Sequence, residues 1–108
     1  MAAAVADAEN GAMAGTLSDS EIEQALVRLP GWAREGDEIS RWYELPSFRA
    51  AIDFVEGIAD LAEAADHHPD LDIRYRRVRV VLSTHDAGGI TRKDIDLATQ
   101  IEAAVPDV

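Results

Sequence analysis

The chain has 108 residues, a length that suits one domain with a modest core. Its formal charge is −11, from 21 acidic and 10 basic residues, and a surface of that sign repels nucleic-acid phosphates and anionic lipids. We therefore expect no direct nucleic-acid partner and no membrane partner. The absence of cysteine excludes disulfides, iron–sulfur clusters and thiolate zinc sites.

The first 16 residues are rich in alanine and contain no basic residue, so they do not have the pattern of a signal peptide. We predict a disordered tail over 1–16, a single domain over 17–108 and a cytoplasmic location. The first helix is predicted to begin at Ser18, because Ser18 and Glu21 form a capping box, and to end at Pro30-Gly31.

Two short alternating segments, 32–35 and 39–45, predict a hairpin with its turn at Gly36-Asp37. A long helix is predicted over 48–66, because apolar residues recur there at helical spacing. Pro69 should stop this helix, since the residue before a proline is pushed out of helical geometry.

Residues 71–75 and 78–85 also alternate between apolar and polar side chains and predict a second hairpin, although Arg76-Arg77 lacks the usual Gly or Asn of a tight turn. A second capping pattern, Thr91 to Asp94, begins a final helix. The order α-β-β-α-β-β-α predicts an α+β fold, in which three helices pack on one face of a four-stranded antiparallel sheet.

All three histidines lie within residues 67–85: His67 and His68 precede Pro69, and His85 ends a predicted strand. Side chains at the ends of helices and strands often project into clefts, and imidazole can donate and accept protons near neutral pH. The pattern therefore predicts acid–base chemistry. Glu63 precedes His67 by four residues, a helical spacing that predicts a contact between the two side chains.

The residues alone leave alternatives open. The histidines could be surface residues without a role, or they could bind zinc together with a carboxylate, although the spacing lacks His-x-His and His-x-x-x-His. Asp94 could serve the helix cap, orient a histidine, or do both. Trp32 and Trp42 suit a core or an interface, but an indole could also stack on a flat heteroaromatic substrate.

The spacing of Glu63, His67-His68-Pro69, Tyr75, His85 and Asp94 resembles the signature of the pterin-4a-carbinolamine dehydratase family. Further pieces agree with it, namely Leu29-Pro30-Gly31-Trp32, Ser83-Thr84-His85-Asp86, Gly88-Gly89-Ile90-Thr91 and Leu97-Ala98. The resemblance covers about residues 18–105.

This resemblance implies a reaction, the dehydration of 4a-hydroxytetrahydrobiopterin to quinonoid dihydrobiopterin, which recycles the tetrahydropterin cofactor of aromatic amino acid hydroxylases. It also implies a homodimer or a homotetramer, and an enzyme that needs neither a metal nor a cofactor. The implied catalytic residues are His67, His68, His85 and Asp94. The implied substrate-binding residues are Glu63, Asp66, Pro69, Ser83, Thr84, Asp86 and Trp32.

Two other functions fit the same resemblance. Some animal members of the family also stabilise dimers of a homeodomain transcription factor, so the chain could be a protein-binding or dimerisation module. It could also act on another pterin or on a molybdenum-cofactor precursor. The retained histidines and Glu63 favour the enzyme, because an adaptor has no physical need for them.

Overall fold

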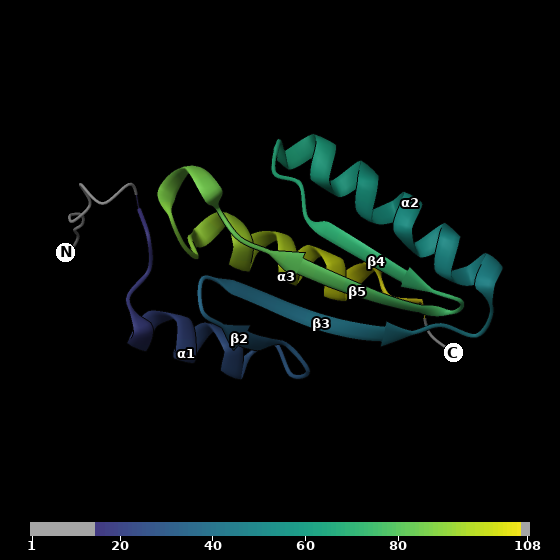
Figure 1. The fold of residues 1–108 in the computed structure, drawn as a ribbon, viewed down its shortest axis with the longest axis horizontal. Helices are drawn as coiled ribbons and strands as arrows, with labels where there is room; N and C mark the ends of the chain where they lie inside the picture. Colours follow the sequence, from purple (N-terminus) through teal and green to yellow (C-terminus); the bar gives the residue numbers. More distant parts are fainter. Residues whose placement is uncertain (1–14, 107–108) are drawn as a thin grey trace.

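The computed structural model describes residues 15–106, which form three α-helices and one four-stranded antiparallel sheet. The elements are α1 (Asp19–Val27), β2 (Ala33–Glu35), β3 (Glu38–Glu44), α2 (Phe48–Ala65), β4 (Asp70–Arg74), β5 (Arg77–Leu82), the short 3-10 turn η1 (His85–Ala87) and α3 (Arg92–Ala104). This order confirms the predicted α+β fold (Figure 1).

The two hairpins join through their inner strands, because the strand order in the sheet is β2-β3-β5-β4. Ile39 lies opposite Leu82 and Tyr43 opposite Val78, and these four side chains are at most 4% exposed. Helix side chains complete one continuous core on this face, where α2 packs on α3.

The opposite face of the sheet is open in the described part of the chain. Trp42 is 41% exposed there, and its ring lies 4.7 Å from the guanidinium carbon of Arg77.

The last strand of the sheet, β5, is shorter than predicted. The sequence pattern extends it to His85, but β5 ends at Leu82. The reason is a local turn: the Thr84 N–H donates to the Gly89 carbonyl at 2.9 Å, and the Thr84 carbonyl accepts from the N–H groups of Ala87 and Gly88. The chain therefore leaves the sheet before His85, which becomes part of η1.

The predicted hairpin between β4 and β5 forms without glycine. Tyr75 takes the left-handed backbone conformation (φ 56°) that the turn requires, and its side chain is 70% exposed.

The predicted disordered tail, 1–16, lies mostly outside the described residues. Thr16 is described and forms an isolated β-bridge with Thr91, and the Leu17 N–H donates to the Ile90 carbonyl at 2.9 Å. None of the helices within 15–106 is long and apolar enough to cross a membrane.

A half-buried carboxylate ties the C-terminal part of α3 to the sheet. Glu102 accepts hydrogen bonds from Trp32 Nε1 (3.3 Å), Arg41 Nη1 (2.5 Å) and the Tyr43 hydroxyl (2.7 Å). Burial, followed by the hydrogen bond to Glu102, raises the pKa of Tyr43, so this phenol remains a donor at neutral pH. The cluster orients α3 against the inner sheet face.

We expect Glu102→Ala to lower the free energy of unfolding by about 2–3 kcal/mol, because three donors lose one acceptor. Urea unfolding followed by circular dichroism measures this change. Glu56→Ala is the matched control, because Glu56 is exposed on α2, and should change the stability by less than about 0.5 kcal/mol. Equal losses in the two variants would contradict the role of Glu102.

Candidate active site

Helix α2 ends in a backbone reversal that separates the two adjacent histidines. Asp66 takes the left-handed conformation (φ 51°), the His67 N–H donates to the Ala62 carbonyl at 3.0 Å, and the Asp66 N–H donates to the Glu63 carbonyl at 3.2 Å. This is a Schellman motif, and Asp tolerates its left-handed position better than most residues. The side chain of His67 is consequently 10% exposed, whereas that of His68 is 56% exposed.

The buried His67 meets a buried carboxylate. Nε2 of His67 lies 2.6 Å from Oδ1 of Asp94, whose side chain is 0% exposed. The other oxygen of Asp94 accepts from the Thr84 hydroxyl (2.8 Å) and the Thr91 N–H (2.9 Å). An ionised carboxylate can only accept, so the proton of a neutral His67 ring belongs on Nε2 and Nδ1 remains an acceptor.

Asp94 therefore caps α3 and orients a histidine at the same time. The hydroxyls of Thr84 and Thr91 lie 2.8 Å apart. Because the Thr84 hydrogen points to Asp94, the Thr91 hydroxyl donates to the Thr84 oxygen. Thr91 in turn accepts from the Lys93 N–H at 3.2 Å, so the start of α3 is bonded to the segment that follows β5.

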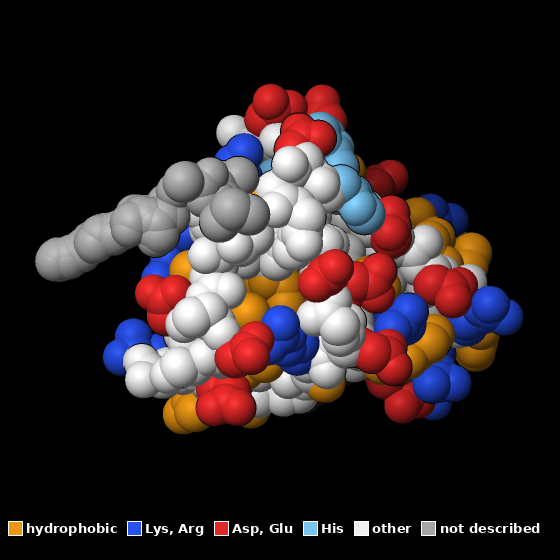
Figure 2. Space-filling model, turned by 60° about the vertical axis from the view of Figure 1, so that its left-hand side comes forward, with side chains coloured by type: hydrophobic (Ala, Val, Ile, Leu, Met, Phe, Trp, Pro, Cys, Tyr) orange, Lys and Arg blue, Asp and Glu red, His pale blue; other side chains and the backbone are white. Residues whose placement is uncertain are grey.

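The three histidines line one pocket, and Figure 2 shows histidine side chains close to acidic ones on one face of the molecule. The pocket has a volume of about 220 Å³ and opens between the end of α2, the segment after β5 and the start of α3. The residues that line it are Asp66, His67, His68, Ser83, Thr84, His85, Asp86 and Lys93. Asp94 lies behind this lining, through its bonds to His67 and Thr84.

Other predicted site residues lie at the edge of this pocket. Glu63 contacts His68 (Oε2 to Nε2, 2.6 Å), and the predicted contact between Glu63 and His67 is wrong, because α2 ends before His67 and the reversal turns that ring inward. Pro69 is half-buried between the pocket and β4 but does not line the pocket.

The structure does not bring Trp32 to the histidines. Trp32 is 6% exposed and bonds Glu102, eight residues after Asp94 on α3, which corresponds to about 12 Å of helix. Of the two alternatives for Trp32, the fold therefore supports packing in the core.

Lys93 lines the pocket, although it was not among the site residues expected from the sequence. The signal that could have found it is its place in the second capping pattern, directly before Asp94. A cation in the first turn of a helix opposes the helix dipole, which marks Lys93 as unusual there. Within 15–106, no three His, Cys, Asp or Glu side chains converge in a way that could hold a metal.

We expect Asp94→Asn to reverse the tautomer of His67. The asparagine amide that faces the ring can donate, so Nε2 would become the acceptor and the proton would move to Nδ1. Nitrogen chemical shifts of the histidine rings, measured by NMR, report this exchange. Asp94→Ala is the companion variant and should lower the free energy of unfolding by about 2–4 kcal/mol, because three buried donors lose their acceptor. An unchanged His67 ring in Asp94→Asn would contradict the assigned hydrogen bond.

Comparison with known proteins identifies relatives over most of the chain. The model of the family described as pterin 4 alpha carbinolamine dehydratase matches residues 15–104. A protein of Roseiflexus sp. (strain RS-1), provisionally named a pterin-4-alpha-carbinolamine dehydratase, is 61% identical over 83% of this chain and 97% of its own length. A protein of Nocardia farcinica with the same provisional name is 58% identical over 80% of this chain and 90% of its own length.

Comparison with solved structures identifies proteins of the same fold. The crystal structure of a transcriptional coactivator/pterin dehydratase from Brucella melitensis superposes with a TM-score of 0.82 at 35% identity, covering 85% of this chain and all of that one (100%). A pterin dehydratase-like RuBisCO assembly factor of the α-carboxysome shares the fold at a TM-score of 0.58 and 15% identity, over 71% of this chain and 89% of that one. The chain belongs to the pterin 4 alpha carbinolamine dehydratase family.

Proposed function

We propose that this protein removes water from 4a-hydroxytetrahydrobiopterin to give quinonoid dihydrobiopterin, by acid–base catalysis with histidines. The observation that carries the proposal is the convergence of His67, from the end of α2, and His85, from η1, on one pocket. The hydrogen bond between His67 and Asp94 supports an acid–base role, because a carboxylate stabilises an imidazole ring that takes up a proton. Membership of the family supports the substrate class.

The reaction needs two proton movements and no redox change. The C4a hydroxyl of the substrate leaves as water after it receives a proton, and N5 loses its proton. The electron pair of the N5–H bond forms the C4a=N5 double bond as the C4a–O bond breaks. The products are one quinonoid dihydropterin and one water, so atoms and charge balance.

The two proposed catalytic histidines, His67 and His85, have different surroundings. The buried Asp94 holds Nε2–H of His67 and leaves its Nδ1 as an acceptor, so we assign His67 the removal of the N5 proton. His85 is exposed and makes no side-chain hydrogen bond within residues 15–106, so its ring is accessible and we assign it the proton delivered to the leaving hydroxyl. His68, paired with the exposed Glu63, is assigned to holding the pterin ring.

The space available fits a flat bicyclic ligand that is only partly enclosed. A second hollow, of about 340 Å³, adjoins the histidine pocket and shares Thr84, Asp86 and Lys93 with it. The pterin ring would lie over the histidines, and the C6 substituent would extend toward this second hollow. Asp66, Ser83 and Asp86 would contact the ring from the histidine side.

We expect His67→Ala and His85→Ala each to lower kcat by about 10²–10⁴-fold, because each removes one proton transfer. The assay mixes the protein with freshly generated 4a-hydroxytetrahydrobiopterin and follows its ultraviolet decay above the spontaneous rate. Gln100→Ala, an exposed change on α3, is the control and should leave the rate unchanged. Wild-type turnover in both variants would contradict the catalytic roles assigned to His67 and His85.

We expect the activity to survive exhaustive dialysis against a chelator, because the proposed chemistry uses only side-chain proton transfer. The rate is measured before and after dialysis, and again after Zn²⁺ is added back. A loss on dialysis that Zn²⁺ restores would favour the zinc alternative.

A second candidate function is protein binding. It is favoured by the Brucella melitensis relative, a protein described as both a transcriptional coactivator and a pterin dehydratase. Titration calorimetry with a stable reduced pterin separates the two functions. Saturable binding that His67→Ala weakens supports the enzyme, whereas no pterin binding together with a tight protein partner supports the adaptor. Action on another pterin would appear as a preference among substrates in the same assay.

The homodimer or homotetramer, the aromatic amino acid hydroxylase pathway and the cytoplasmic location remain predictions. A subunit interface would cover exposed apolar side chains, of which the described residues offer Val27, Trp42, Phe48, Ile73 and Tyr75.

A further inference from the structure

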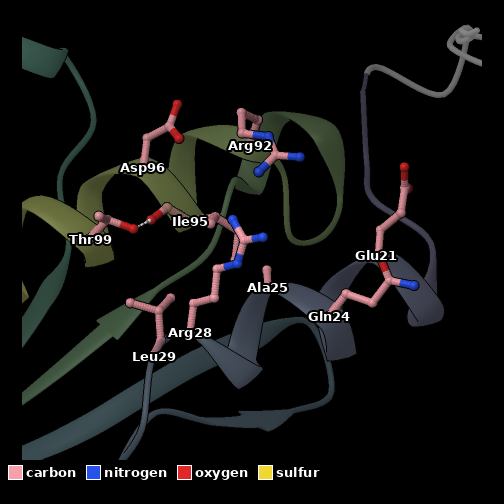
Figure 3. Close-up of a pocket in the computed structure, with 9 residues that line it drawn as sticks. All are labelled: Glu21, Gln24, Ala25, Arg28, Leu29, Arg92, Ile95, Asp96 and Thr99. Carbon is pink, nitrogen blue, oxygen red and sulfur yellow. Dashed lines mark hydrogen bonds between the residues drawn. The ribbon is translucent and has the colours of Figure 1, made fainter. Parts of the chain in front are cut away.

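A groove lies between α1 and α3, away from the histidine pocket. It has a volume of about 510 Å³ and shares no lining residue with that pocket, although Arg92 also lines the second hollow beside the pocket. Its lining is mixed: Ala25, Leu29 and Ile95 supply the apolar part, and the other lining residues are polar or charged. Two arginines from different elements line this groove: Arg28 follows the end of α1 and Arg92 lies at the start of α3 (Figure 3).

Neither arginine is neutralised by the protein. Within residues 15–106, the side chains of Arg28 and Arg92 form no ion pair and no hydrogen bond, whereas Arg34, Arg41 and Arg74 each hold a carboxylate within 3.0 Å. Carboxylates are plentiful, since the chain contains 21 acidic residues. Two unpaired arginines that line one groove of such an acidic protein form a positive group that an external anion would neutralise.

The acidic residues of the groove do not neutralise these two arginines. Glu21 and Asp96 lie on opposite sides of the groove (Figure 3), and within residues 15–106 neither forms an ion pair with Arg28 or Arg92. Oε1 of Glu21 is also occupied, because it accepts the Ser18 N–H at 2.8 Å in the capping box.

The first turn of α3 places further positive charge next to the groove. Arg92 and Lys93 are its first two residues, where the helix dipole favours anions and disfavours cations. Asp94 is the acidic residue of this first turn, but it is fully buried and bonded to Thr84, Thr91 and His67. An anion bound between Arg28 and Arg92 would therefore offset both the repulsion of the two cations and their unfavourable place on the helix.

We propose that this groove binds a small organic anion. Its carboxylate or phosphate group would lie between Arg28 and Arg92, since the planar guanidinium fork matches both oxyanions. Its apolar body would lie on Leu29 and Ile95, and the volume suits a molecule of metabolite size. The inference does not depend on the dehydratase activity.

Three probes test the site: phenyl phosphate, benzoate and inorganic phosphate, each titrated into the protein while NMR follows the arginine Nε–H signals. We expect saturable shifts of Arg28 and Arg92, with at least one of the two aromatic anions bound more tightly than inorganic phosphate. The preference between phenyl phosphate and benzoate identifies the oxyanion.

Arg28→Ala and Arg92→Ala should each weaken the binding about tenfold or more, since each removes charge-assisted hydrogen bonds. Arg28→Lys keeps the charge but not the fork, and should bind less tightly than the wild type. Arg49→Ala is the matched control, because Arg49 is exposed on α2 and outside the groove. Thermal unfolding of each variant verifies that it is folded.

The site would be overturned if none of the three probes gave saturable shifts. It would also be overturned if Arg49→Ala weakened probe binding as much as Arg28→Ala does. Tighter binding of inorganic phosphate than of both aromatic anions would overturn its assignment to an organic ligand. Titrating His67→Ala with the same probes keeps the two proposals apart, because this variant should lose dehydratase activity and still bind the probes.

Discussion

The candidate site depends on one interaction, the burial of the Asp94 carboxylate among three hydrogen-bond donors. A charge removed from water must be paired and hydrogen-bonded. The donors come from three parts of the chain: His67 follows α2, Thr84 follows β5, and Thr91 precedes α3. Displacing any one of these segments would leave a buried charge short of a partner. The Asp94 carboxylate therefore fixes the relative positions of the segments that carry the histidines before any substrate is bound.

Helix α3 carries one hydrogen-bonded carboxylate near each end, Asp94 and Glu102, and each has a different structural role. Asp94 near the start gathers groups around an open pocket, whereas Glu102 gathers Trp32, Arg41 and Tyr43 against the sheet. Apolar residues such as Leu97 and Ile101 fill the interval. The first cluster can take part in chemistry because the pocket reaches His67, while the second sets the position of the helix on the sheet.

Charge is distributed unevenly around the start of α3. The chain is strongly acidic, yet Lys93 lines the histidine pocket and Arg92 lines the neighbouring groove. Since long-range repulsion would keep anions away from such a protein, a local group of cations has a large effect on where an anion can bind. The first turn of α3 thus contributes consecutive residues to both candidate sites, and Arg92 also lines the hollow beside the histidine pocket.

The sequence by itself determined the order of the elements, because capping boxes at Ser18 and Thr91 and the apolar periodicities are signals within a few residues. It also identified two histidine segments as candidates for one site. Tertiary structure alone decided that His67 rather than His68 meets Asp94, 27 residues away, and that Trp32 lies elsewhere. The left-handed turn at Asp66 directs His67 to Asp94, and the hydrogen bond to Glu102 holds Trp32 near the other end of α3. Both depend on how distant segments share hydrogen bonds, which local spacing does not encode.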